Sequence, residues 1–152
     1  MDRLDQIISE FQNNEEEVLA LLVELKQRRE SDISEMVKSV HQNAKEHGWW
    51  EEERLFGEII ALCHSELSEA LEEHRNNRKP NEIYYRDSKN GATATWKSEN
   101  FNKPEGVPIE LADVIIRIFD YCGHANIDIK SAIVEKMQYN KGRPYKHGGK
   151  VI

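Results

Sequence analysis

Two pairs of acidic residues, each spaced one helical turn apart, are the part of this sequence best suited to chemistry. Glu66 and Glu69 lie in "HSELSEALEE", and Glu110 and Asp113 lie in "PIELADVII". Residues three apart share one face of a helix, so each pair presents two carboxylates on the same side. Such pairs are also common on solvated helix faces, so a single pair would be weak evidence for a site.

The helix expected around the second pair favours a site over a solvated face. From 108 to 122 the sequence is apolar almost all round, and its few polar residues form one narrow stripe. A helix this apolar is expected near the centre of a bundle, where a carboxylate must be paired or must bind a cation. Carboxylate oxygens suit hard divalent cations, and neither pair includes a histidine at a ligand spacing. The sequence therefore predicts Mg²⁺, with Mn²⁺ as a substitute, bound by Glu66, Glu69, Glu110 and Asp113.

Helical periodicity dominates the elements that must position these residues. We expect helices after Asp32, from Phe56 to about Asn76, from Pro108 to Gly123, and from about Asp128 to Asn140. Asp32 is placed to cap the first of these helices, and Gly48 is placed to end it. The pattern predicts an all-α protein, a bundle of four to five helices.

One stretch, residues 82–97, interrupts this helical pattern. It contains Asn90-Gly91 between two segments with Tyr, Ile, Thr and Trp. Asn-Gly favours the positive φ angles of a type I′ turn, so we expect a small β-hairpin inserted between two helices.

The N-terminal segment has its own pattern. Apolar residues from Leu4 to Leu25 recur at steps of three and four, in a short heptad-like stripe. The polar run "QNNEEE" in its middle also fits a turn, so one long helix and a helical hairpin both remain open. We divide the chain into a helical extension, 1–31, and one domain, 32–152.

Composition restricts the classes of function. The chain has 152 residues and a formal net charge of −7, which argues against nucleic-acid binding. It has no apolar run long enough for a bilayer and no signal-peptide pattern, and its two cysteines are too few for a disulfide framework. We therefore expect a soluble cytoplasmic protein without a membrane partner. The segment from Lys136 to Lys150 has five Lys or Arg residues and no acid, which suits an anionic ligand or a solvated terminus.

Three stretches together resemble the MazG-like, all-α NTP pyrophosphatases. "HSELSEALEEHR", "PEGVPIELADVIIRIFDYCG" and "EKMQYNKGRPYKHGGK" occur in the order and spacing of that family, over roughly Ile33 to the C-terminus. The resemblance implies a helical fold and Mg²⁺-dependent hydrolysis of a nucleoside or deoxynucleoside triphosphate to the monophosphate and pyrophosphate. It also implies a homodimer or higher homo-oligomer. The N-terminal extension and much of the hairpin lie outside the family pattern.

The family motifs assign roles to residues of this chain. The Glu-x-x-Glu motif matches Glu66 and Glu69, and the Glu-x-x-Asp motif matches Glu110 and Asp113, as catalytic metal ligands. The downstream basic and amide positions, which bind phosphate, match Lys136, Asn140 and Arg143.

Three further assignments come from the residues themselves. Glu69 is our candidate general base for the attacking water. Trp50 and Tyr145 are candidates for stacking on the base, with simple packing as the alternative. The sequence also fits two other hypotheses, a non-catalytic helical adaptor and a nucleotide-binding regulator without turnover.

Overall fold

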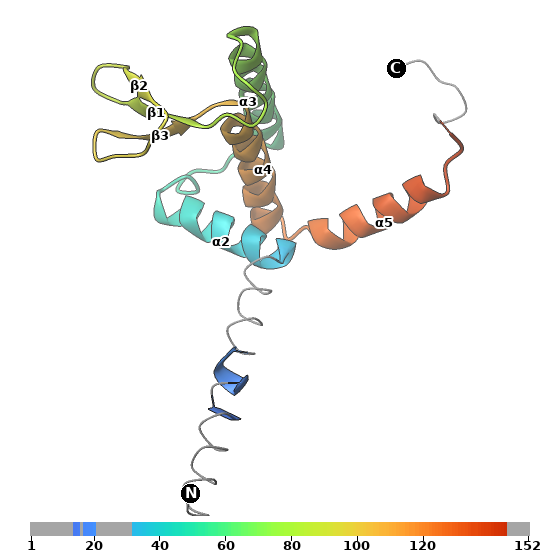
Figure 1. Cartoon of the computed structure of the whole chain (residues 1–152). Helices are drawn as coiled ribbons and strands as arrows, with labels where there is room; N and C mark the ends of the chain where they lie inside the picture. Colours follow the sequence, from blue (N-terminus) through green and yellow to red (C-terminus); the bar gives the residue numbers. More distant parts are fainter. Residues whose placement is uncertain (1–13, 16, 21–31, 146–152) are drawn as a thin grey trace, which may run out of the picture. The chain divides into compact units, whose positions relative to one another are not determined.

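The computed structural model describes residues 14–15, 17–20 and 32–145, and it is mostly helical with a small antiparallel sheet. The described elements are α2 (Ile33–Glu46), α3 (Phe56–Arg75), β1 (Tyr84–Asp87), β2 (Thr93–Ala94), β3 (Phe101–Glu105), α4 (Val107–His124) and α5 (Ile129–Lys141) (Figure 1). The predicted helical class with a β insertion is confirmed. The predicted extension, 1–31, lies outside the described residues except for 14–15 and 17–20, which are helical.

The chain forms two compact units. One is Val37–Asp128, which contains most of α2, all of α3 and α4, and the sheet. The other contains both ends of the chain, and its described part includes the start of α2 and all of α5. Within that second unit, Lys130 Nζ lies 2.8 Å from Asp32 Oδ2. In the described part of the chain, no helix combines the length and the apolar content needed to cross a bilayer.

Local sequence signals explain both ends of α2. The Ser34 amide donates a hydrogen bond of 2.9 Å to Asp32 Oδ1, so Asp32 caps the helix as expected. At the other end, Gly48 has a φ of 77°, and the Trp49 amide donates to the Ala44 carbonyl at 3.1 Å. A glycine in this left-handed conformation lets the chain turn while the last helical carbonyls keep donors.

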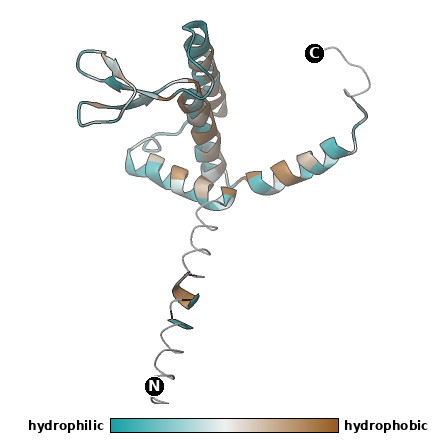
Figure 2. Ribbon diagram, viewed as in Figure 1, coloured by the Kyte–Doolittle hydropathy of each residue, from teal (hydrophilic) through white to brown (hydrophobic). Residues whose placement is uncertain are grey.

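Helices α3 and α4 lie side by side and position the acidic pairs (Figure 1). The buried face of α3 is formed by Ile59, Cys63, Glu66 and Ala70. In α4, Glu110 is buried along with Phe119 and Cys122. The hydrophobic character of α4 extends along most of its length (Figure 2). One carboxylate from each pair is thus on a packed helix face rather than on a solvated one.

Gly123 has a different role from the one expected. The sequence placed the end of the helix at this residue, but α4 continues to His124 and Ala125 is its C-cap. A Cβ atom at Gly123 would lie 2.5 Å from His41 Cβ, so the glycine permits close approach of α2 to α4. A glycine at this position in the sequence predicts a helix end equally well, because glycine serves both at helix ends and at close helix contacts.

We expect Gly123→Ala to destabilise the protein by about 1–3 kcal/mol, because the added methyl group must displace His41. Gly57→Ala is the matched control, since Gly57 is also helical and a Cβ there meets nothing within 4 Å. That control should stabilise the protein by about 0.5–1 kcal/mol through helix propensity. Urea unfolding of both variants checks the pair. Equal changes at the two positions would contradict the packing role of Gly123.

The inserted sheet has three antiparallel strands in the order β2-β1-β3. The predicted hairpin is present, but its predicted type I′ turn is wrong. Only Gly91 has positive φ, at 75°, and its amide donates to the Asp87 carbonyl at 2.9 Å. Because β1 and β2 pair at Arg86 and Thr93, the loop is longer than the two residues that a type I′ turn connects.

The sheet is anchored at the end of α3 and at the start of α4. The Tyr84 side chain in β1 is 3% exposed, and its hydroxyl donates to Glu73 Oε1 in α3 at 2.9 Å. At the other junction, Gly106 has a φ of 117°, and a Cβ there would overlap the Glu82 carbonyl oxygen. The residue that joins β3 to α4 therefore has to be glycine.

Candidate functional site

Three of the four predicted ligands come together between α3 and α4. Glu66, Glu69 and Glu110 each offer a carboxylate oxygen, and these oxygens lie within 4.8 Å of one another. Glu66 is 7% exposed and Glu110 is 5% exposed, whereas Glu69 is exposed to solvent. The site is therefore a group of oxygens with a buried floor and one open side.

Asp113 is not in this close group, although its charge acts on it. It is half-buried one turn after Glu110 on α4. Burial raises the pKa of Asp113, and the nearby charge of Glu66 raises it further. Asp113 also lines a neighbouring cavity of about 220 Å³. The structure thus brings together the three glutamates and places the aspartate at their edge.

The crowding of carboxylates affects the pKa of Glu110. Burial, followed by the charges of Glu69 and Asp113, raises the pKa of Glu110 to about 7. A buried carboxylate among other carboxylates favours its neutral form, because neither water nor enough positive charge compensates the anion. The carboxylates around Glu110 therefore carry more negative charge than the neighbouring side chains compensate.

This shift predicts a pH-dependent stability for the metal-free protein. Between pH 4.5 and 7 the folded Glu110 holds a proton that the unfolded chain has released, so stability falls as pH rises through this window. Relative to Glu110→Gln, the wild type should lose about 2–3 kcal/mol between pH 5 and pH 8. Urea unfolding with a chelator present measures the difference. Glu72→Gln, an exposed change on α3, should instead follow the wild type; parallel curves for Glu110→Gln would contradict the shift.

Two cationic contacts flank the carboxylates, and the sequence did not predict one of them. Arg117 Nε on α4 donates to Glu66 Oε1 on α3 at 2.8 Å, so Arg117 pairs with a neighbouring carboxylate of the facing helix. Lys103 Nζ lies 2.9 Å from Glu105 Oε1, and the buried Glu105 adds its charge to those that act on Glu110. Both Lys103 and Glu105 are in β3, which no sequence signal identified as a strand near the site.

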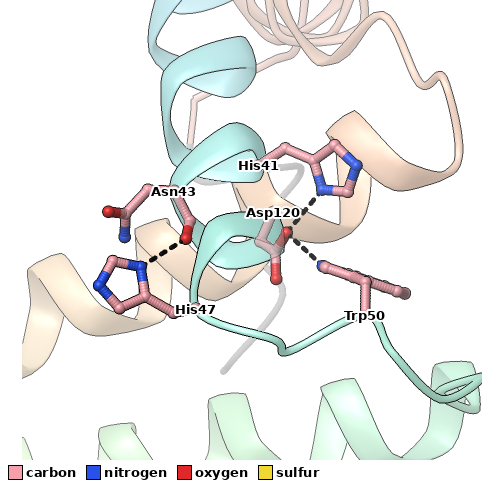
Figure 3. Close-up of polar contacts among 5 residues, drawn as sticks. All are labelled: His41, Asn43, His47, Trp50 and Asp120. Carbon is pink, nitrogen blue, oxygen red and sulfur yellow. Dashed lines mark hydrogen bonds and ion pairs between the residues drawn. The ribbon is translucent and has the colours of Figure 1, made fainter.

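A second polar cluster joins α2 and the following loop to α4. Asp120 Oδ1 accepts hydrogen bonds of 2.8 Å from Trp50 Nε1 and from His41 Nδ1, which point toward it from two directions (Figure 3). Trp50 also stacks on His124, with 3.8 Å between ring centroids. The Trp50 ring is therefore engaged in packing, and its stacking on a base stays a prediction. His41 was missed because its partner is 79 residues away in sequence.

Comparison of this chain with protein families, curated proteins and solved structures found no match.

The predicted phosphate ligands lie in the second unit. Lys136 and Asn140 are exposed on α5, and Arg143 follows the helix. Lys136 Nζ lies 5.0 Å from the centroid of the Tyr139 ring, and Arg143 Cζ lies 5.9 Å from it. Both cations are therefore within cation–π distance of the same aromatic ring. Tyr145 is 87% exposed. Contact of these residues with a substrate at the carboxylates stays a prediction.

Proposed function

We propose that this protein is a Mg²⁺-dependent nucleoside triphosphate pyrophosphohydrolase of the MazG-like type. The observation that supports the proposal is the meeting of Glu66, Glu69 and Glu110, which come from two different helices and offer oxygens within 4.8 Å of one another. The function would be removal of unwanted nucleotides from the pool.

The chemistry of the three residues fits the proposed cation. All donors in the group are carboxylate oxygens, the ligands that Mg²⁺ and Mn²⁺ prefer. The raised pKa of Glu110 indicates that the group needs more positive charge than its surroundings supply. Glu69 is exposed, so a ligand can approach from the solvent side. Asp113, one turn beyond Glu110, is a further ligand in this proposal.

In this proposal, different residues of the chain have different roles in hydrolysis. A bound divalent cation supplies charge neutralisation of the phosphates and a lower pKa for a coordinated water. Glu69, which is exposed, would accept the proton of the attacking water at a carboxylate oxygen. Lys136, Asn140 and Arg143 would bind phosphate oxygens, with Arg143 in a bidentate manner. The products would be the monophosphate and pyrophosphate.

A substrate panel with pyrophosphate detection tests the proposal. Canonical and damaged ribo- and deoxyribonucleoside triphosphates are incubated with and without Mg²⁺, and release of pyrophosphate is measured. We expect Mg²⁺-dependent release from at least one of them. A protein whose melting temperature Mg²⁺ leaves unchanged would favour the adaptor hypothesis. A protein that binds Mg²⁺ and nucleotide without releasing pyrophosphate would favour the regulator hypothesis.

We further propose that the protein is a homodimer or higher homo-oligomer. In α3, the half-exposed residues Ile60, Leu67 and Leu71 are seven and four positions apart. In α4, Leu111, Ile115 and Ile118 are four and three apart and are exposed to a similar degree. On each helix these residues share one face, so apolar stripes of this kind favour association of subunits.

Light scattering at micromolar concentration measures the oligomeric state. We expect the wild type to be a dimer or a larger species. Ile115→Glu should shift it toward the monomer, because a charge on the stripe cannot be desolvated without a partner. Lys97→Glu, an exposed change outside both helices, should leave the assembly unchanged. A wild-type monomer would contradict the proposal.

We also place the protein in the cytoplasm. Cys63 and Cys122 are both buried free thiols, on α3 and α4. Buried thiols without a disulfide are typical of a reducing compartment.

A further inference from the structure

Arg117 occupies a position between the carboxylate group and a cavity. Its guanidinium binds Glu66 from the facing helix, with Nε 2.8 Å from Oε1 and with Nη2 in contact with the same oxygen. Within residues 32–145, no other ion pair involves Glu66, Glu69 or Glu110. Arg117 also lines the cavity of about 220 Å³, together with Asp113 and Asp120.

The ion pair does not use the full hydrogen-bonding capacity of the carboxylate. A guanidinium matches a carboxylate best when its two parallel N–H groups bond both oxygens. Here both donors converge on one oxygen of Glu66. The Glu66 side chain is 9% exposed, whereas that of Arg117 is 28% exposed and therefore accessible to a ligand.

The charges explain why the guanidinium sits there. Three glutamates meet within 4.8 Å, and Asp113 lies at their edge, so the Arg117 guanidinium is attracted to this concentration of negative charge. A divalent cation at the same oxygens would neutralise them and weaken the attraction for Arg117. The guanidinium would then be adjacent to any anion that arrives with the cation.

We propose that Arg117 is a substrate-contacting residue that leaves Glu66 and binds a phosphate oxygen when a divalent cation occupies the carboxylates. The proposal rests on the function proposed above. Arginine suits this step because its planar fork binds phosphate in bidentate fashion and it stays charged at every relevant pH. The cavity that Arg117 lines is smaller than the 300–1,000 Å³ typical of a site for a whole ligand, so it fits one part of the substrate beside the phosphates.

Binding measurements separate this role from a structural one. The probes are Mn²⁺ alone, and then inorganic triphosphate at saturating Mn²⁺, which reports phosphate contacts without a base or sugar. For Arg117→Gln we expect Mn²⁺ to bind at least as tightly as to the wild type, because a competing cation has gone. Triphosphate should bind roughly tenfold or more weakly, because a charge-assisted contact is lost. Arg75→Gln is the control, since Arg75 is exposed on α3 and pairs only loosely with Glu72.

Two results would overturn the proposal. If Arg117→Gln weakens Mn²⁺ and triphosphate together, Arg117 merely supports Glu66. If triphosphate affinity stays unchanged, the ion pair is static. Arg117→Lys keeps a charge beside Glu66 and serves if the glutamine variant does not fold; it should retain Mn²⁺ binding and bind triphosphate with intermediate affinity. A wild type that binds no Mn²⁺ would instead overturn the proposed function, and this role with it.

Discussion

Replacement of Glu110 by glutamine is expected to lower kcat/KM for a triphosphate substrate on the order of a thousandfold or more. Glu110 is the least exposed of the grouped carboxylates, at 5%. Glutamine keeps the shape of the side chain and its hydrogen-bonding oxygen but removes the charge that would bind the cation. The loss should therefore come from cation binding rather than from unfolding.

Stability and metal binding provide the checks on this result. Without Mg²⁺, Glu110→Gln should be at least as stable as the wild type above pH 7, because the crowded negative charge has gone. The rise in melting temperature on addition of Mg²⁺ should be lost. Glu72→Gln, on the same helix pair but exposed, should keep both activity and the Mg²⁺ response. Near-native turnover of Glu110→Gln at saturating Mg²⁺ would refute the metal site.

Lys136→Ala should lower kcat/KM by roughly tenfold to a hundredfold. The expected loss follows from a charge-assisted hydrogen bond to phosphate, worth about 1.5–3 kcal/mol. Lys136 and Arg143 both lie near the Tyr139 ring, and Asn140 is one helical turn from Lys136. Lys136 and Arg143 are therefore near the same ring, and we expect one triphosphate to contact more than one of these side chains.

The matched control for this change is Lys89→Ala, in the exposed loop between β1 and β2. Both substitutions should leave the free energy of unfolding within about 0.5 kcal/mol of the wild type, as is usual for exposed residues. Only the change at Lys136 should affect kcat/KM. Equal, near-native activities in the two variants would make the basic segment a solvated helix end, as the sequence also allows.

Helix positions could be predicted well because their signals are local. The Asp32 cap, the Gly48 turn and the Pro108 start all act within a few residues of the helix end that they define. The grouping of Glu66, Glu69 and Glu110 was also predicted from spacing within each helix, together with the expectation that the apolar helix is central. The prediction that the two acidic pairs meet required one assumption, namely that the two helices that carry them pack against each other.

What the sequence could not predict depends on contacts between distant segments. Strand β3 has no apolar alternation and contains Pro104, which is tolerated because β3 is an edge strand. The hairpin turn was misjudged because Asn-Gly signals positive φ without fixing the length of the loop. Asp113 lies at the edge of the group rather than within it, since its distance depends on how α4 is rotated against α3.

The junction at Gly106 has a consequence for engineering this protein. Strand β3 ends at Glu105, and Gly106 alone connects it to the first turn of α4. In that turn, the amide nitrogen of Glu110 donates a hydrogen bond to the Gly106 carbonyl. An added or deleted residue here would rotate the sheet by about 100° relative to α4 and move Lys103 and Glu105 away from Glu110. The opposite end of the sheet, at residues 88–91, is an exposed loop distant in sequence from any of the grouped ligands. An epitope tag, a fluorophore or a fused domain therefore belongs at that loop, where its length is decoupled from the geometry of the glutamates.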